Sequence, residues 1–140
     1  MQRARRFGEV IMLEKITREE LDRVRENAVL MENIAEKIAK LERIIKDRGE
    51  NFARTKEMQN LKLSYKILDE SELRQRALRV IQDNALPPFH KTVLYEYYVL
   101  GKPAKAIAAD TFRNERGIYM QLRKARIKLG IQGECRTNHS

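Results

Sequence analysis

The chain has 140 residues, of which 42% are hydrophobic and 35% are charged, and it carries a formal net charge of +9. This length allows about one domain with a modest core. Because Cys135 is the only cysteine and His90 and His139 are the only histidines, an internal disulfide is excluded, and we expect neither a metal site nor a cofactor.

The N-terminus predicts neither a signal peptide nor a membrane span. Its Arg-rich start is typical of the first part of a signal peptide, but Glu9, Glu14 and Lys15 interrupt the uncharged segment that should follow. No stretch approaches the ~20 consecutive apolar residues that cross a membrane. We therefore expect a cytoplasmic protein without membrane contact, whose residues 1–16 form a flexible leader.

A long helix is predicted from Thr17 to Arg48. Thr17 and Glu20 have the spacing of a capping box, and Gly49 is suited to end the helix. Apolar residues recur every seven positions, with a second set between them, as in a coiled coil: Val24, Met31, Ile38 and Ile45, with Ile34 and Leu41. The helix must bury this seam against a second chain or against later helices of its own chain. We favour a homodimer through residues 17–48 and keep the intramolecular arrangement as the alternative.

Two shorter helices are predicted next, from about Ala53 to Leu68 and from about Glu72 to Asn84, because apolar residues recur on one helical face in each. The diproline at residues 87–88 ends the second of them, since proline removes a backbone donor and disfavours a helical residue before it. We place a domain boundary there, with residues 17–86 as a helical oligomerisation region. No run of alternating β-branched residues predicts a strand, so the expected fold is all-α.

The C-terminal part predicts three helices in residues 87–130, followed by a flexible tail at 131–140. The first runs to Gly101, a short second one spans Ala104 to Asp110, and Asn114 caps a third that ends near Gly130. Residues 89–140 contain ten Lys or Arg against four Asp or Glu, which favours nucleic acid or an anionic membrane surface as the partner. A short helix, a tight turn and a longer helix with a basic outer face fit the major groove of DNA.

The last two of these helices resemble region four of bacterial sigma factors. That family reads x-x-I-A on the first helix and S-E-x-T-V-x-x-x-L-x-R-A-x-x-x-L on the recognition helix, where this chain has Ala104-Lys105-Ala106-Ile107-Ala108 and then Asn114 to Leu129. With its helical N-terminal part, the whole chain resembles the late-gene transcription activators of phages of Gram-positive bacteria, the ArpU and RinA type. Two positions depart from the pattern. Phe112 stands in a turn that usually contains glycine, where we expect it to fill the core slot of the usual leucine, and Gly117 replaces the usual threonine.

The resemblance implies a set of residues that contact DNA. The base-reading positions are Asn114, Glu115, Arg116, Tyr119, Met120 and Arg123, and we expect Lys102, Lys105, Lys124, Arg126 and Lys128 to hold the phosphate backbone, with Arg113 of the turn beside them. Arginines pair bidentately with guanine, and tyrosine contacts a thymine methyl group or a phosphate.

The expected function is sequence-specific binding of double-stranded DNA by a transcription regulator, a phage-type late-gene activator that acts with RNA polymerase in the cytoplasm of a bacterial host cell. We expect no enzyme, because the sequence offers no nucleophile set and no glycine-rich phosphate loop. One alternative is the DNA-recognition subunit of a phage packaging machine, which also joins a helix-turn-helix to an oligomerising helical part. The other is a protein that binds RNA polymerase without DNA specificity of its own.

Overall fold

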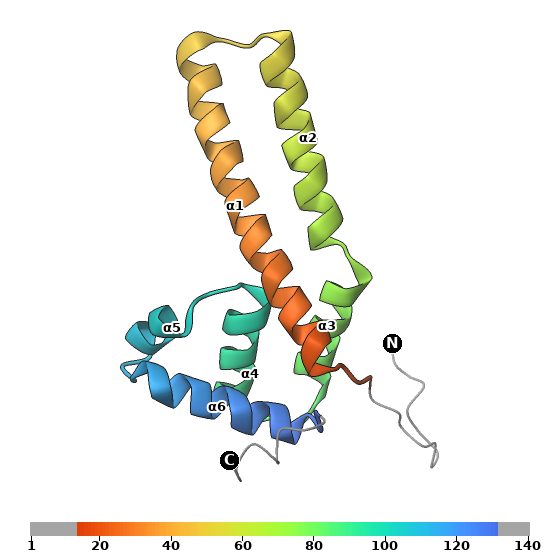
Figure 1. Cartoon of the computed structure of the whole chain (residues 1–140), viewed down its shortest axis with the longest axis vertical. Coiled ribbons are helices and arrows are strands. Elements are labelled where there is room, and N and C mark those ends of the chain that lie inside the picture. The colour runs from red at the N-terminus through yellow and green to blue at the C-terminus, as the bar shows by residue number, and fades with distance from the viewer. Residues whose placement is uncertain (1–13, 132–140) are drawn as a thin grey trace.

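The computed structural model describes residues 14–131. They form six α-helices and one π-helical segment, in the order α1 (Arg18–Arg48), α2 (Phe52–Asp69), α3 (Glu72–Asp83), α4 (Pro88–Leu94), η1 (Tyr95–Val99), α5 (Ala104–Asp110) and α6 (Glu115–Lys128). No strand occurs among these residues, and the expectation of an all-α fold is confirmed. Figure 1 shows α1 and α2 as a long hairpin that rises from a body made by the other helices.

The ends of α1 are set by the residues that the sequence singled out. The Thr17 hydroxyl accepts a hydrogen bond from the Glu20 amide at 3.0 Å, and the Glu20 carboxylate accepts one from the Thr17 amide at 3.0 Å. This reciprocal pair satisfies two amides that a helix start leaves open, and it confirms the predicted capping box. Gly49 ends the helix with a φ of +85° and donates its amide to the Ile45 carbonyl.

The apolar seam of α1 is covered in part by the same chain. Val24, Met31, Ile34 and Leu41 are buried, and α2 runs antiparallel along the outer half of α1, while α3 and η1 pack against its first half (Figure 1). We call the projecting part, residues 36–68, the arm. The intramolecular alternative therefore accounts for the buried part of the seam, and a homodimer through residues 17–48 stays a prediction.

One hydrophobic cluster crosses the predicted domain boundary. It joins Leu21 and Val24 of α1 to Val80 of α3 and to residues of α4, α5 and α6. The diproline therefore makes a turn between two helices that share a core, and the predicted division into two domains at this point does not match the packing. Ile16 and Ile131 also belong to this cluster, so the predicted leader and tail each extend one or more residues too far. The rest of both segments, residues 1–13 and 132–140, lies outside the described residues.

Two arginines tie the N-terminal helices to the π-helical segment. Arg25 donates to the carbonyls of Tyr97 at 2.6 Å and Lys102 at 2.9 Å, and its guanidinium lies over the Tyr97 ring, 3.8 Å from the centroid. Arg74 donates to the Val99 carbonyl at 2.7 Å. A charged donor makes a stronger hydrogen bond than a neutral one, so these contacts fix α1 and α3 against η1.

Candidate nucleic-acid interface

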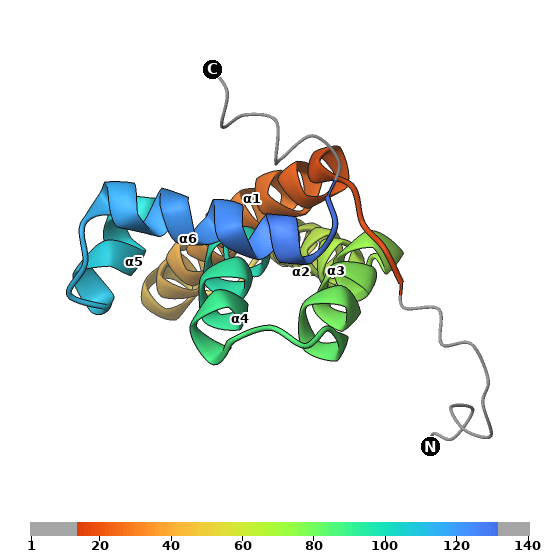
Figure 2. The same ribbon diagram turned by 90° about the horizontal axis from the view of Figure 1, so that it is seen from below.

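Helix α6, the predicted recognition helix, lies across the end of the molecule opposite the tip of the arm (Figures 1 and 2). Its inner side buries Ile118, Leu122 and Ala125 in the shared core. Its opposite side, which we call the outer face of α6, is exposed and consists of Arg116, Met120, Lys124, Ile127 and Lys128. The predicted amphipathic helix with a cationic exposed side is therefore present, and its apolar side holds it firmly in the body.

The start of α6 is capped as the sequence predicted. The Asn114 side chain accepts a hydrogen bond from the Gly117 amide at 2.7 Å. A Cβ at position 117 would lie 3.1 Å from the Asn114 Oδ1 atom, so glycine leaves room for this cap. Because the Asn114 oxygen is engaged with the backbone, the side chain serves the helix start, while Glu115 and Arg116 of the first turn are exposed.

Arg116 and Arg123, the two arginines expected to read bases, differ in their surroundings. Arg116 is exposed on the outer face of α6. Arg123 is only partly exposed and makes a contact within the chain. Arg116 is therefore the more accessible of the two for a ligand of α6.

Arg126 corrects the sequence prediction, because it is not on the outer face. It is 8% exposed, and its guanidinium donates to the Tyr98 hydroxyl at 3.0 Å. Burial raises the pKa of the Tyr98 hydroxyl, and the nearby positive charge of Arg126 opposes that rise. Position 126 follows Leu122 by four residues, so it lies on the core side of the helix. The sequence pattern had assigned every cation of α6 to the surface, and a buried arginine with a role in packing cannot hold a phosphate.

Tyr119 is exposed but is supported by its neighbours. Its ring makes an edge contact with the Tyr97 ring, with centroids 6.3 Å apart, and Tyr97 in turn packs edge-on against Tyr98. Partial burial raises the pKa of the Tyr119 hydroxyl, and the neighbouring Tyr97 adds to this effect. Because Tyr97 also carries the Arg25 guanidinium, a chain of ring contacts connects α1 to the exposed edge of α6.

The two lysines predicted before the turn are not equivalent. Lys102 lies 2.9 Å from a carboxylate oxygen of Asp110 and 3.5 Å from one of Glu96, and the hydrogen bond to Asp110 raises its pKa. Its charge is therefore already balanced within the protein. Lys105 is exposed on α5, and among residues 14–131 no ion pair is recorded for it, which leaves its charge available to a ligand.

The turn between α5 and α6 contains a feature that the sequence prediction missed. Phe112 has a φ of +57°, a left-handed conformation that costs a residue with a side chain about 1–2 kcal/mol, and it is 97% exposed. The expectation that Phe112 fills a core slot is wrong, because this backbone conformation directs the ring into solvent. Arg113 beside it stacks its guanidinium over the partly buried Phe89 ring, 4.2 Å from the centroid. The available signal was the absence of glycine from a turn that needs a left-handed residue.

A buried polar contact holds α6 against α4. The His90 Nε2 atom lies 2.9 Å from the Gln121 Oε1 atom, and His90 is buried. The sequence pattern does not predict this contact, since His90 stands out there only as one of two histidines. Within residues 14–131, no group of three or more His, Cys, Asp or Glu side chains is arranged to hold a metal ion, and none of the helices there has the length and apolar character to cross a membrane.

Comparison of the chain with protein-family models, curated proteins and solved structures found no match. The resemblance to sigma region four therefore rests on the residues of α5 and α6 alone.

Proposed function

We propose that this protein is a transcription regulator that binds double-stranded DNA by placing the first turns of α6 in the major groove. The observation that supports this proposal is the outer face of α6, where three cations are exposed on a helix whose opposite side is buried in the core. Dense negative charge is the partner that such a surface attracts most strongly.

The dimensions of α6 agree with this proposal. A helix of 14 residues is about 21 Å long and about 10–12 Å wide with its side chains, and the major groove is about 12 Å wide. In this arrangement Arg116 reads a base edge, with guanine as its preferred partner. Lys124 and Lys128 follow on the same face and contact phosphates, and Lys105 and Arg113 do the same from the flank.

The proposal includes a cytoplasmic protein that acts with RNA polymerase through binding and not through catalysis. It also includes the predicted homodimer, which would place two copies of α6 on half-sites about 34 Å apart or a multiple of that distance. Since α2 packs along α1 and covers part of its seam, a dimer through residues 17–48 would use the surface of α1 that α2 leaves exposed. Sedimentation of the protein with and without its DNA site measures the stoichiometry directly.

The deciding experiment is selection of bound duplexes from random DNA, followed by affinity measurements on three variants. We expect Arg116→Ala to weaken binding to the selected sequence by about 1–3 kcal/mol, or roughly 5- to 150-fold, and to relax the preference at one base pair. Lys128→Ala should weaken all sequences alike and reduce the slope of log affinity against log salt by about one. Lys40→Ala, on the exposed side of the arm, is the matched control and should bind as the unchanged protein does.

If the selection enriched no duplex, the proposal that the protein binds specific DNA sequences would be refuted. If the Arg116 and Lys40 variants bound the selected sequence equally well, α6 would not be the helix that contacts the bases. Arg123→Ala, tested in parallel, measures how far the partial burial of that side chain limits its access to a base.

A further inference from the structure

The side of α2 that faces away from α1 exposes large apolar side chains in a row. Phe52 is 85%, Leu63 57% and Ile67 61% exposed. Leu63 and Ile67 follow Phe52 by 11 and 15 residues, which is close to three and four helical turns. The three side chains therefore lie on one side of the helix. α2 contains no buried residue at all, because its other side only partly covers the α1 seam.

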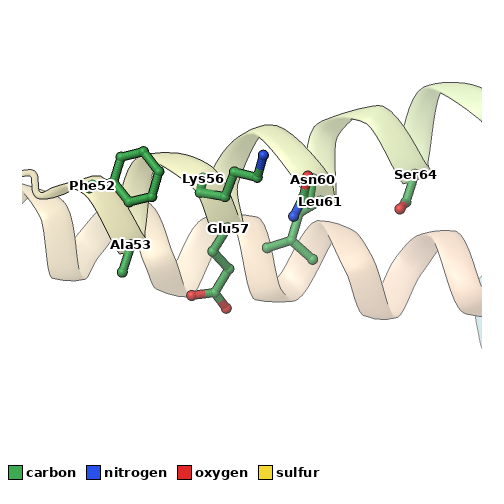
Figure 3. A pocket seen from close by; sticks show the side chains of 7 residues that line it. All are labelled: Phe52, Ala53, Lys56, Glu57, Asn60, Leu61 and Ser64. Atoms are coloured by element: carbon green, nitrogen blue, oxygen red, sulfur yellow. The ribbon is translucent and has the colours of Figure 1, made fainter.

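Beside this row, the surface of α2 is hollowed. A groove of about 450 Å³ runs along the helix from Phe52 to Ser64. Figure 3 shows Phe52 and Lys56 on the side away from α1, while Ala53 and Leu61 point toward it. Ala53 and Leu61 line the groove on that side together with Glu57, and the Phe52 ring lies at one end. The apolar part of this lining suits the insertion of an apolar side chain from a partner.

Positive charges outnumber negative ones around the row. Lys56, Lys62 and Lys66 are exposed, and no ion pair is recorded for any of them within residues 14–131. α2 contains four Lys or Arg against two carboxylates, those of Glu57 and Asp69, and the whole arm contains nine Lys or Arg against five Asp or Glu. A second copy of this surface would bring like charges together, whereas a partner with carboxylates would pair with them.

We propose that this outer face of α2, formed by Phe52, Lys56, Lys62, Leu63, Lys66 and Ile67, is a docking site for an acidic amphipathic helix of another protein. Phe52 and Ile67 are about 22 Å apart along the helix axis, the length of about four turns of a partner. The partner helix lays its apolar side on the row, and its Asp and Glu side chains pair with the three lysines. The arm rises away from α6 (Figure 1), so this site is independent of the proposed DNA contact.

The test uses the full-length protein as bait for a display library of random peptides of about 20 residues. Selected peptides should have apolar residues at helical spacing and an excess of Asp and Glu. Changing Phe52, Leu63 and Ile67 together to Ser should weaken their binding at least about tenfold, and so should changing the three lysines to Glu. Because these side chains are exposed, both variants should unfold at the temperature of the unchanged protein.

Matched controls separate this surface from general adhesion to a basic protein. Leu30→Ser removes an exposed apolar side chain of α1, and Lys40→Glu with Lys46→Glu reverses exposed charges on the other helix of the arm. Both should keep the peptide affinity, and so should Arg116→Ala on α6.

Four outcomes would each overturn the proposal. They are selection of neutral or basic peptides, full binding by the triple Ser variant, self-association that the triple Ser variant abolishes, and adsorption to phosphatidylglycerol vesicles that is stronger than peptide binding and is lost in that variant. The third outcome would assign the surface to a second copy of the chain, and the fourth to a membrane.

Discussion

Replacing Gly101 with alanine tests how closely α1 packs against the loop that leads into the proposed DNA-binding helices. Gly101 has a φ of +75°, and a Cβ atom there would lie 3.1 Å from the Ala28 Cβ atom and 3.2 Å from the Val29 amide nitrogen. The left-handed conformation costs alanine about 1–2 kcal/mol. Crowding against a backbone atom that cannot rotate away adds about 1–3 kcal/mol. We expect the free energy of unfolding to fall by about 2–5 kcal/mol in total.

Gly130→Ala is the matched control, because Gly130 has a φ of +78° and nothing lies within 4 Å of its Cβ position. It should lose only the conformational part, about 1–2 kcal/mol. Denaturant unfolding measures both losses, and in thermal unfolding each kcal/mol should lower Tm by about 3–6 °C for a chain of this size. Equal losses in the two variants would refute the close approach of α1 to this loop.

Substitutions at three other sites, one of them with a matched control, test separate features. Phe112→Gly should raise the free energy of unfolding by up to about 1 kcal/mol, since it relieves the left-handed strain and loses no packing. If chemical denaturation showed a lower free energy of unfolding instead, the Phe112 ring would not be exposed in the turn. Arg126→Ala should lower the free energy of unfolding by about 2–4 kcal/mol, whereas Lys128→Ala should change it by less than about 0.5 kcal/mol. Similar unfolding curves for these two variants would contradict the burial of Arg126. The pKa of Glu20 is lowered from 4.5 by the Thr17 amide and by Arg76, so its contribution to stability is present above pH 4.5 and is lost as the pH falls through the lowered pKa. Glu20→Gln should therefore lower stability at pH 7 and flatten its fall below about pH 5; parallel pH profiles for the two proteins would argue against this assignment.

Local signals in the sequence located the helices well. Thr17, Gly49 and Asn114 set helix ends through hydrogen bonds or backbone conformations that involve only neighbouring residues. Such effects depend on residue type and spacing, and both can be read from a sequence. The apolar stripe of α6 was equally clear, because Ile118 and Leu122 recur at helical spacing on a helix with a polar opposite side.

Properties that depend on distant contacts could not be read in the same way. The heptad pattern predicts that Met31 and Leu41 are buried, but it does not distinguish burial against a second chain from burial against a later helix of the same chain. The burial of Arg126 depends on the Tyr98 hydroxyl, 28 residues away, which supplies the partner that a buried arginine needs. The exposure of Phe112 follows from a backbone conformation that hydrophobicity does not encode.

The bonds from Arg25 and Arg74 to the carbonyls around η1 bear on how this protein can be divided. A fragment that begins at the diproline would keep α4, α5 and α6. It would lose the guanidinium groups of Arg25 and Arg74 and the apolar side chains of α1 and α3 that complete the core around these helices. Moving α4, α5 and α6 onto another scaffold would therefore require moving α1 and α3 with them. A change of DNA specificity is better made by altering side chains within the intact protein.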